Sequence, residues 1–332
     1  MNYNDFLELL SEPTAARLEE LASHAHELTL KNFGRTILMY APIYLGNECV
    51  NQCAYCGFAE KGEGVFLSVK EALAEAEILH QKGFRHILLV SGERRDKVTM
   101  AYLKEVISAL HKKFDSIGLE IFPLEEAEYR ELFLAGADGL TIYQETYDRD
   151  VYKQMHGQGP KANYDFRLGA PERATRAGFY RINIGALLGL NDWRAEAAAL
   201  GKHAAYLKKK FWRAQISVSF PRLQPSSSKF KPPHPVSDRD LTQMICALRI
   251  FQPTLGLVLS TRESEALRDN LIPLGLTQMS AESKTNPGGY SKKFWADEQF
   301  EVADKRSVEE VAAAIFAKDY EPVFKDWDRV FI

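Results

Sequence analysis

Cysteine is scarce in this 332-residue sequence, which holds four in all, and three of them crowd together at Cys49, Cys53 and Cys56. So few thiols, clustered in this way, do not form the disulfide framework of a secreted domain and favour a reducing compartment. The sequence also lacks an apolar run long enough to span a bilayer. Its first residues, MNYNDFLELLSEP, are acidic and periodic, unlike a secretory signal. We therefore expect a cytoplasmic protein with no membrane partner.

An excess of positive charge is missing as well. The formal net charge is −3, so the chain offers no broad basic field for nucleic acid. Hydrophobic residues make up 45% of the sequence and charged residues 26%, which is typical of a soluble globular protein. The length suits a single α/β barrel. We expect a small-molecule substrate and no nucleic acid partner.

The pattern of apolar residues predicts an α/β fold. Apolar positions recur every three or four residues up to about residue 33, which predicts helices. Beyond that point, short apolar runs alternate with amphipathic stretches, as parallel strands with crossover helices require. Eight such units predict a closed (β/α)8 barrel of the TIM type, with an open or partial barrel as the alternative. The strand candidates are residues 37–45, 86–92, 119–123, 139–144, 181–189, 215–220, 255–261 and 270–280.

We divide the chain into three parts. Residues 1–34 form a helical lead, residues 35–290 form the barrel with a cysteine-bearing loop at 46–58, and residues 291–332 form a helix and tail packed on the barrel. Residues 222–235 are rich in proline and serine, which predicts a long loop at a strand end that covers the site as a lid. Polar motifs follow seven of the predicted strands, where barrel enzymes place their active sites.

The cysteine spacing, Cys-x3-Cys-x2-Cys, points to a particular kind of metal site. Structural zinc usually takes four nitrogen or sulfur ligands in pairs, and the nearest histidine after the loop, His80, falls in a predicted helix. Three thiolates can instead bind three irons of a [4Fe–4S] cluster and leave the fourth iron open. A zinc site in a barrel without catalysis, and a chance cluster of buried cysteines, are the alternatives.

This spacing, with the aromatic Tyr55 before the third cysteine, resembles the radical S-adenosylmethionine superfamily. The resemblance implies that Cys49, Cys53 and Cys56 hold a [4Fe–4S] cluster whose open iron binds the amino and carboxylate groups of S-adenosylmethionine. It further implies that one-electron reduction yields a 5′-deoxyadenosyl radical, which is chemistry that the cofactors supply while the protein orients and shields them.

Further motifs carry a resemblance to one family, the 2-iminoacetate synthases, which are the anaerobic tyrosine lyases of thiazole formation in thiamine biosynthesis. These motifs cover most of the chain and read YLGNECVNQCAYCGF, LLVSGE, YQETY, RLGAPERATRAG, GALLGL, SVSFPRL, LSTRES, SKTNPGGY and PVFKDWD. The resemblance implies cleavage of the Cα–Cβ bond of L-tyrosine to 2-iminoacetate and p-cresol. It also implies a thiazole synthase as partner and a reductant such as flavodoxin or ferredoxin.

Two relatives share this barrel and bear on the substrate. The tyrosine lyase that matures [FeFe]-hydrogenase carries an added cysteine-bearing C-terminal domain, whereas no cysteine follows Cys246 here, which argues against that activity. A tryptophan lyase, or a related lyase with another aromatic substrate, stays open as an alternative because only the aromatic pocket would need to differ.

The resemblance also implies a set of residues that bind S-adenosylmethionine. Each has a structural alternative, which is a tight turn, a salt bridge on the barrel rim or simple packing. The set comprises Tyr55 beside the adenine, Gly92 and Glu93 at the methionine amino group, Gln144, Glu145 and Arg167 at the ribose and carboxylate, and Ala186 and Leu187 as an apolar shelf for the adenine.

An amino-acid substrate needs a fixed positive charge for its carboxylate. Arg262 follows the seventh predicted strand, and its planar guanidinium suits a carboxylate. The resemblance adds Tyr44, just upstream of the cysteine loop, and Ser280, after the eighth strand, as groups that position the substrate. Arg222 competes with Arg262 for the same role, and His156 is a candidate acid–base group near the predicted mouth.

Overall fold

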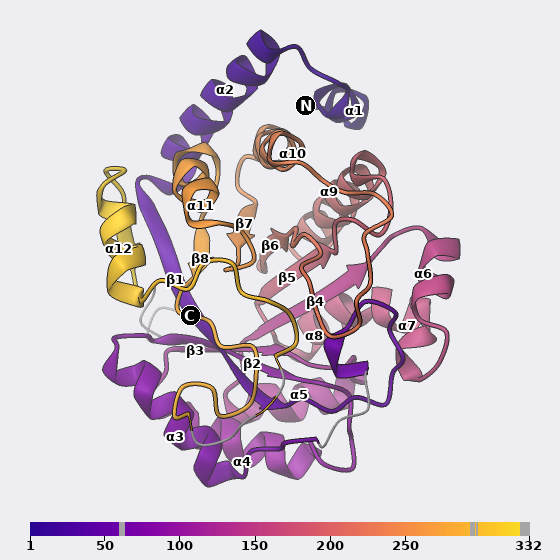
Figure 1. Ribbon diagram of the computed structural model, residues 1–332, viewed down its shortest axis with the longest axis vertical. Helices are drawn as coiled ribbons and strands as arrows, with labels where there is room; N and C mark the ends of the chain where they lie inside the picture. The colour runs from indigo at the N-terminus through magenta and orange to yellow at the C-terminus, as the bar shows by residue number, and fades with distance from the viewer. Residues whose placement is uncertain (60–63, 293–295, 297, 326–332) are drawn as a thin grey trace.

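The computed structural model describes residues 1–59, 64–292, 296 and 298–325. Eight parallel strands run in the order β2-β3-β4-β5-β6-β7-β8-β1, and β1 pairs with β2 to close the ring (Figure 1). This confirms the predicted (β/α)8 barrel. The strands are β1 (Thr36–Gly46), β2 (His86–Ser91), β3 (Ser116–Glu120), β4 (Gly139–Glu145), β5 (Arg181–Ala186), β6 (Gln215–Ser219), β7 (Gly256–Leu259) and β8 (Gln278–Ser280).

Helices surround the barrel, and buried apolar side chains of strands and helices form one large core between the two layers. Capping boxes at Ser68, Ser237 and Ser307 fix where three of these helices begin. The helices are α1 (Tyr3–Leu10), α2 (Ala15–Phe33), α3 (Val69–Gln81), α4 (Met100–Leu110), α5 (Glu126–Ala135), α6 (Arg149–Met155), α7 (Tyr164–Leu168), α8 (Ala170–Ala177), α9 (Trp193–Lys210), α10 (Asp238–Phe251), α11 (Glu265–Leu271) and α12 (Val308–Phe316), with 3-10 turns η1 (Gly57–Ala59), η2 (Pro160–Ala162) and η3 (Ile272–Leu274).

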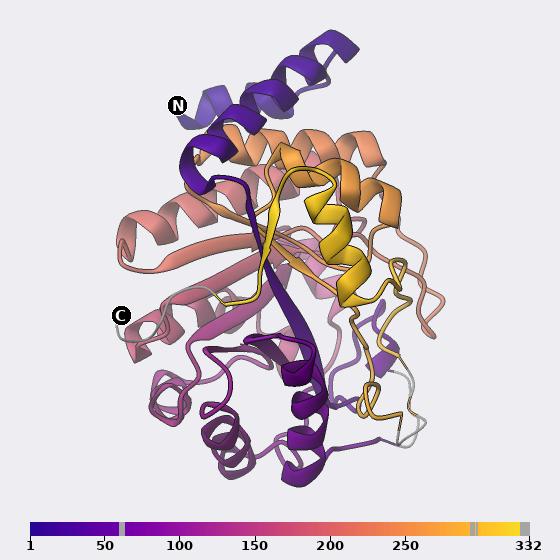
Figure 2. The ribbon, with the colours of Figure 1, turned by 90° about the vertical axis from the view of Figure 1, so that its left-hand side faces the viewer.

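The helical lead packs outside the ring of barrel helices. Helices α1 and α2 both contact α10, and α1 also contacts α9, so the lead stands as a separate layer at one end of the molecule (Figure 2). Phe6 of α1 stacks on Phe251 of α10 with 4.2 Å between ring centroids. Within the described residues, no helix is both long enough and apolar enough to cross a membrane.

The eighth strand is shorter than the sequence pattern predicts. Of the residues expected to be strand, 270–280, the first part ends α11 and forms η3, and only Gln278–Ser280 are extended. Pro273 occupies the start of η3, where its fixed φ favours a helical turn and its missing N–H is harmless. The apolar run is therefore a buried helix end joined to a strand, which periodicity alone does not distinguish from one long strand.

The predicted C-terminal helix is present as α12, and a strand that the pattern did not indicate follows it. This strand, β9 (Glu321–Val323), pairs in parallel with the first residues of β1, from Thr36 to Leu38. Figure 2 shows α12 and β9 beside the indigo strand β1. The last residues of the expected tail, 326–332, lie outside the described residues.

One buried ion pair fixes the segment that follows β8. Arg268 of α11 pairs with Asp304, and both side chains are 0% exposed. Arg268 also donates to the carbonyl of Ser280, and Arg306 donates to Asp304 at 2.8 Å. The backbone N–H groups of residues 303 and 304 donate to the carbonyl of Thr261. The pair therefore joins α11, the end of β8 and the residue before Arg262.

We predict that Asp304→Ala lowers the free energy of unfolding by about 3–5 kcal/mol, because it leaves the buried guanidinium of Arg268 without a counter-charge. Urea unfolding followed by circular dichroism measures the change. The matched control is Glu19→Ala on α2, whose side chain is exposed and should cost well under 1 kcal/mol. Equal loss in the two variants would show that the pair contributes little to stability.

Candidate active site

The three clustered cysteines lie in the loop that follows β1, at the carboxyl end of the barrel. Several backbone hydrogen bonds hold this loop down. Val50 N–H donates to the carbonyl of Glu93 at 2.9 Å, and Ala54 N–H donates to the carbonyl of Met155 at 3.1 Å. The loop is thus fixed both to the end of β2 and to the end of α6.

Gly92 permits the close approach of this loop to β2. A Cβ atom at residue 92 would lie 2.4 Å from the carbonyl oxygen of Glu48, closer than such atoms can pack, and 3.2 Å from Cβ of Cys49. The resemblance implied that Gly92 lies at the methionine amino group of S-adenosylmethionine. The structure shows that the cysteine loop itself makes the approach, and that Gly92 also lines the cavity below it.

Asn51 ties the first cysteine to its surroundings. Its amide donates to the Glu93 carboxylate at 2.7 Å and to Cys49 Sγ at 3.4 Å. The backbone N–H of Glu93 donates to the same sulfur at 3.3 Å. Two donors on one sulfur suit a thiolate, because a charged acceptor forms the stronger hydrogen bond.

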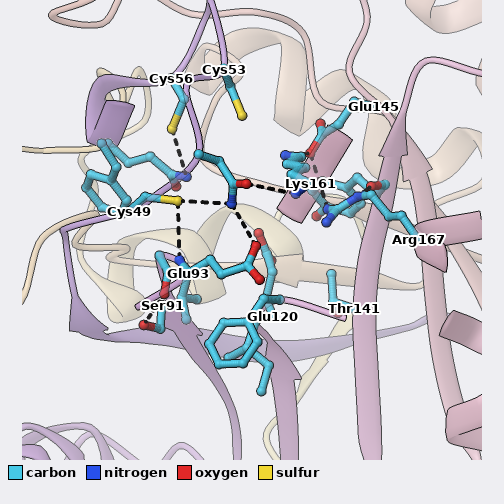
Figure 3. Close-up of a pocket in the computed structure, with 18 residues that line it drawn as sticks. Cys49, Cys53, Cys56, Ser91, Glu93, Glu120, Thr141, Glu145, Lys161 and Arg167 are labelled. Carbon is cyan, nitrogen blue, oxygen red and sulfur yellow. Dashed lines mark hydrogen bonds and ion pairs between the residues drawn. The ribbon is translucent and has the colours of Figure 1, made fainter. Parts of the chain in front are cut away.

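All three thiols line one open cavity, which we call the cluster cavity (Figure 3). Burial raises the pKa of Cys53 to about 12 and also raises the pKa of Cys56. Thiolates at these positions therefore need bound cations, which iron supplies. Within the described chain, no three His, Cys, Asp or Glu side chains converge on a single point where one metal ion could bind. A [4Fe–4S] cluster makes a different demand, because each cysteine binds its own iron, and three thiols facing one cavity fit it.

Opposite the thiols, three charged side chains form a buried group, which Figure 3 shows at the right of the cavity. Lys161 Nζ lies 2.6 Å from Glu145 Oε1, and Arg167 Nη2 lies 3.4 Å from the same oxygen. Burial alone would raise the pKa of Glu145, but Lys161 and Arg167 together lower it. Burial would likewise lower the pKa of Lys161, and Glu145 reverses that effect. The group carries one net positive charge, which suits an anionic ligand.

The backbone at Glu145 is strained. Its φ is 70°, in the left-handed region that non-glycine residues rarely occupy. The pairing of β4 with β5 shifts register between Tyr143 and Glu145, and Leu187 N–H donates to the carbonyl of Glu145 at 2.7 Å. A bulge of this kind re-aims a side chain at the end of a strand, here the carboxylate that holds Lys161 and Arg167.

A second cavity, which we call the arginine cavity, is lined by Arg262 together with Tyr44 and Ser280. The structure thus brings the three predicted substrate residues together. The guanidinium of Arg262 lies 3.4 Å from the ring centre of Phe300, and within the described residues its side chain forms no hydrogen bond or ion pair. The buried hydroxyl of Ser283 lacks a hydrogen-bond partner in that same part of the chain.

A third cavity adjoins both of these, and we call it the bridging cavity. It shares Glu145 and Lys161 with the cluster cavity and Arg262 with the arginine cavity. Tyr55 and Leu187 also line it and belong to one apolar cluster. These two side chains are placed where a flat ring could lie between the thiols and Arg262.

Three of the candidate residues lie elsewhere. Gln144 is buried, and its amide reaches the carbonyl of Tyr164 at 3.5 Å rather than lining any of these cavities. Ala186 is fully buried and lines none of the three. Arg222 pairs with Glu263 and Asp238, so its charge is already matched and Arg262 is the better partner for a carboxylate.

His156 is buried as part of a hydrogen-bonded chain. Its Nδ1 lies 2.8 Å from the carbonyl of Tyr152, which makes Nδ1 the donor, so Nε2 accepts from the hydroxyl of Tyr55 at 2.8 Å. Burial, with Lys161 adding to its effect, lowers the pKa of His156 to about 3. The ring is therefore neutral and orients Tyr55.

Sequence reasoning missed Asn51, Lys161, Glu120 and Gln299, which all line the cluster cavity. Gln299 accepts from the hydroxyl of Tyr44 at 2.8 Å and lies 3.9 Å from Cys56 Sγ. The one visible signal for Lys161 was its place in GQGPKAN, a segment rich in turn-forming residues. Nothing in the sequence distinguished Glu120 or Gln299 from other polar residues.

Comparison with known proteins places these features in a family. Residues 43–200 match the radical SAM superfamily, and residues 219–321 match the biotin and thiamin synthesis associated domain. The chain is 42% identical over 98% of its length to the 2-iminoacetate synthase of Escherichia coli K12, covering 87% of that protein. It is 40% identical over 99% of its length to the 2-iminoacetate synthase of Salmonella typhimurium, covering 88%.

A solved structure agrees with these matches. The FeFe-hydrogenase maturase HydG from Carboxydothermus hydrogenoformans superposes with a TM-score of 0.92 at 36% identity, over 98% of this chain and 76% of that one. The resemblance found in the cysteine loop and in the motifs after the strands is thereby confirmed. The chain belongs to the 2-iminoacetate synthase family and is a radical SAM carbon–carbon lyase.

Proposed function

We propose that the chain uses a [4Fe–4S] cluster and S-adenosylmethionine to cleave the Cα–Cβ bond of L-tyrosine, which yields 2-iminoacetate and p-cresol. The observation that carries this proposal is the adjacency of two sites, namely a cavity lined by three thiols and a cavity lined by Arg262. The family membership supplies the reaction, and the charged residues of the two cavities supply places for its ligands.

The chain's own residues divide the work of binding. Cys49, Cys53 and Cys56 would hold three irons of the cluster, which with S-adenosylmethionine supplies the 5′-deoxyadenosyl radical when bound. Lys161 and Arg167 present positive charge to a carboxylate, and Glu145 can accept hydrogen bonds from ribose hydroxyls. Tyr55 and Leu187 offer an apolar surface to the adenine, while Gly92 and Glu93 lie beside Cys49, where the methionine amino group would bind.

Arg262 would bind the carboxylate of the amino-acid substrate, and Tyr44 and Ser280 line the same cavity. The segment 222–235 would cover the site and exclude water from it. Its Ser226 hydroxyl donates to the carbonyl of Tyr55 at 3.3 Å, and the carbonyl of Pro225 accepts from Glu301 N–H at 2.9 Å. Keeping water out protects a reactive imine from hydrolysis.

We further propose the setting in which the enzyme works. A thiazole synthase would take up the unstable 2-iminoacetate, and flavodoxin or ferredoxin would supply the electron. The cytoplasm, whose thiol pools keep cysteines reduced, is where such an enzyme would be found. These proposals rest on the family and on the three cysteines that line the cluster cavity.

We predict that the cluster depends on three cysteines and not on the fourth. Cys49→Ser, Cys53→Ser and Cys56→Ser, each reconstituted anaerobically, should lose most of the bound iron and the visible absorption of the cluster. The control Cys246→Ala changes a buried cysteine of α10 and should keep about four irons per chain, as a [4Fe–4S] cluster requires. Iron and sulfide analysis would contradict the assignment if the control lost as much as the others.

We predict that the reduced, reconstituted enzyme converts L-tyrosine and S-adenosylmethionine to p-cresol and 5′-deoxyadenosine, both detected by mass spectrometry. Arg262→Gln should lower kcat/KM for tyrosine by about 10- to 100-fold, because a charged hydrogen bond to the substrate carboxylate is lost. Deoxyadenosine without p-cresol would retain the radical chemistry and refute tyrosine as substrate. L-tryptophan run in parallel would then show whether the indole side chain is the one released.

A further inference from the structure

Glu120, at the end of β3, is a carboxylate that the known chemistry of the site leaves without a task. It lines the cluster cavity, the arginine cavity and the bridging cavity. Within the described residues, its side chain forms no hydrogen bond or ion pair, whereas Glu145 is held by two cations. Figure 3 shows Glu120 below the cavity, on the side away from Cys53 and Cys56.

An ionised carboxylate that lines a cavity without an ion-pair partner costs free energy unless a ligand compensates its charge. The charged groups that face Glu120 are Arg262 after β7, Glu145 of β4, Arg167 of α7 and Lys161 of η2. The hydroxyls of Tyr40, Tyr44 and Tyr143 also lie within its electrostatic reach. Burial raises the pKa of Glu120 to about 7, although Arg262 opposes the shift. Neither Arg262 nor Glu120 has an ion-pair partner in the described chain, so both charges are available to a ligand.

We propose that Glu120 binds the α-ammonium group of the amino-acid substrate and accepts its proton, while Arg262 binds the substrate carboxylate. This inference rests on the proposed function and adds the group that recognises the amine. The cavity then presents one negative and one positive charge to the two ends of a zwitterion, and these charges fix which way the amino acid points.

The proton transfer balances without any other reactant. The substrate –NH3⁺ gives one proton to the Glu120 carboxylate, which leaves –NH2 and a neutral carboxylic acid, and no electron moves. Removing a hydrogen atom from this neutral amino group gives a nitrogen-centred radical that carries no positive charge. After the products leave, the proton passes from Glu120 to water.

The test compares three ligands that share a phenol ring: L-tyrosine, tyramine, which lacks the carboxylate, and 3-(4-hydroxyphenyl)propionate, which lacks the amine. Dissociation constants are measured by equilibrium dialysis on the full chain with its cluster and S-adenosylmethionine but no reductant, so that nothing turns over. Glu120→Gln should weaken tyrosine and tyramine by about 10- to 100-fold, because one charged hydrogen bond is lost, and leave the propionate unchanged. Arg262→Gln should weaken binding of the propionate and leave binding of tyramine unchanged.

Two controls separate this role from others. Glu105→Gln on the exposed face of α4 should change none of the three affinities. The affinity of S-adenosylmethionine should be the same in Glu120→Gln as in the wild type. The inference is overturned if Glu120→Gln weakens tyramine and the propionate equally, if it weakens neither, or if it weakens S-adenosylmethionine instead.

The pH dependence supplies a readout that a purely structural role would not give. In the wild type, kcat/KM for p-cresol formation should rise with pH through a limb near the pKa of Glu120, because only the ionised carboxylate accepts the proton. Glu120→Gln should lose that limb, and an unchanged profile would refute the proton transfer. If the wild type made no p-cresol, the proposed function would fail; a normal wild type with an unaltered variant would refute only the role of Glu120.

Discussion

The ion pair between Lys161 and Glu145 holds the mouth of this barrel together. Lys161 belongs to the connection after α6, and Glu145 ends β4, so their 2.6 Å contact fixes a loop to a strand. The backbone N–H of Lys161 donates to Asn51 Oδ1 at 2.8 Å, and the amide of Asn51 donates to Glu93 at 2.7 Å. The network therefore runs from β4 through the cysteine loop to the end of β2. In a buried network each member must be satisfied, so the position of Cys49 depends on a lysine more than a hundred residues away.

This network also explains why the mouth tolerates so much buried charge. An isolated charge in this environment would shift its pKa and become neutral, yet the paired Glu145 has a lowered pKa and stays ionised. The strain at Glu145, whose φ is 70°, is of order 1–3 kcal/mol for such a backbone. The strained backbone places the Glu145 carboxylate in contact with Lys161 and Arg167, and these two contacts offset the strain. Glu120, which has no such partners, shows the opposite shift.

The parts of this arrangement that lie within a few residues of one another could be predicted from the sequence. The cysteine spacing, the alternation of strands and helices and the position of Arg262 after β7 are local patterns, and each holds in the structure. Lys161 and Gln299 could not be predicted, because closure of the barrel and the docking of late segments bring them to the cysteines. Gln144 and Glu145 show that the sequence does not tell which of two neighbouring residues faces the site. They are neighbours on one strand, whose side chains alternate between faces, and only Glu145 lines the cavities.

The bounds of the eighth strand could not be predicted from the sequence either. Its apolar run, residues 270–280, reads as one strand, yet residues 270–274 are the end of α11 and a 3-10 turn, and only Gln278–Ser280 pair with β1 and β7. That shortening serves the site. Because α11 ends close to β8, Arg268 can reach the carbonyl of Ser280 and pair with Asp304. The residues after β8 then fold back toward Thr261, which sets Phe300 against the guanidinium of Arg262. A buried ion pair behind the barrel wall thus holds the segment that packs against Arg262.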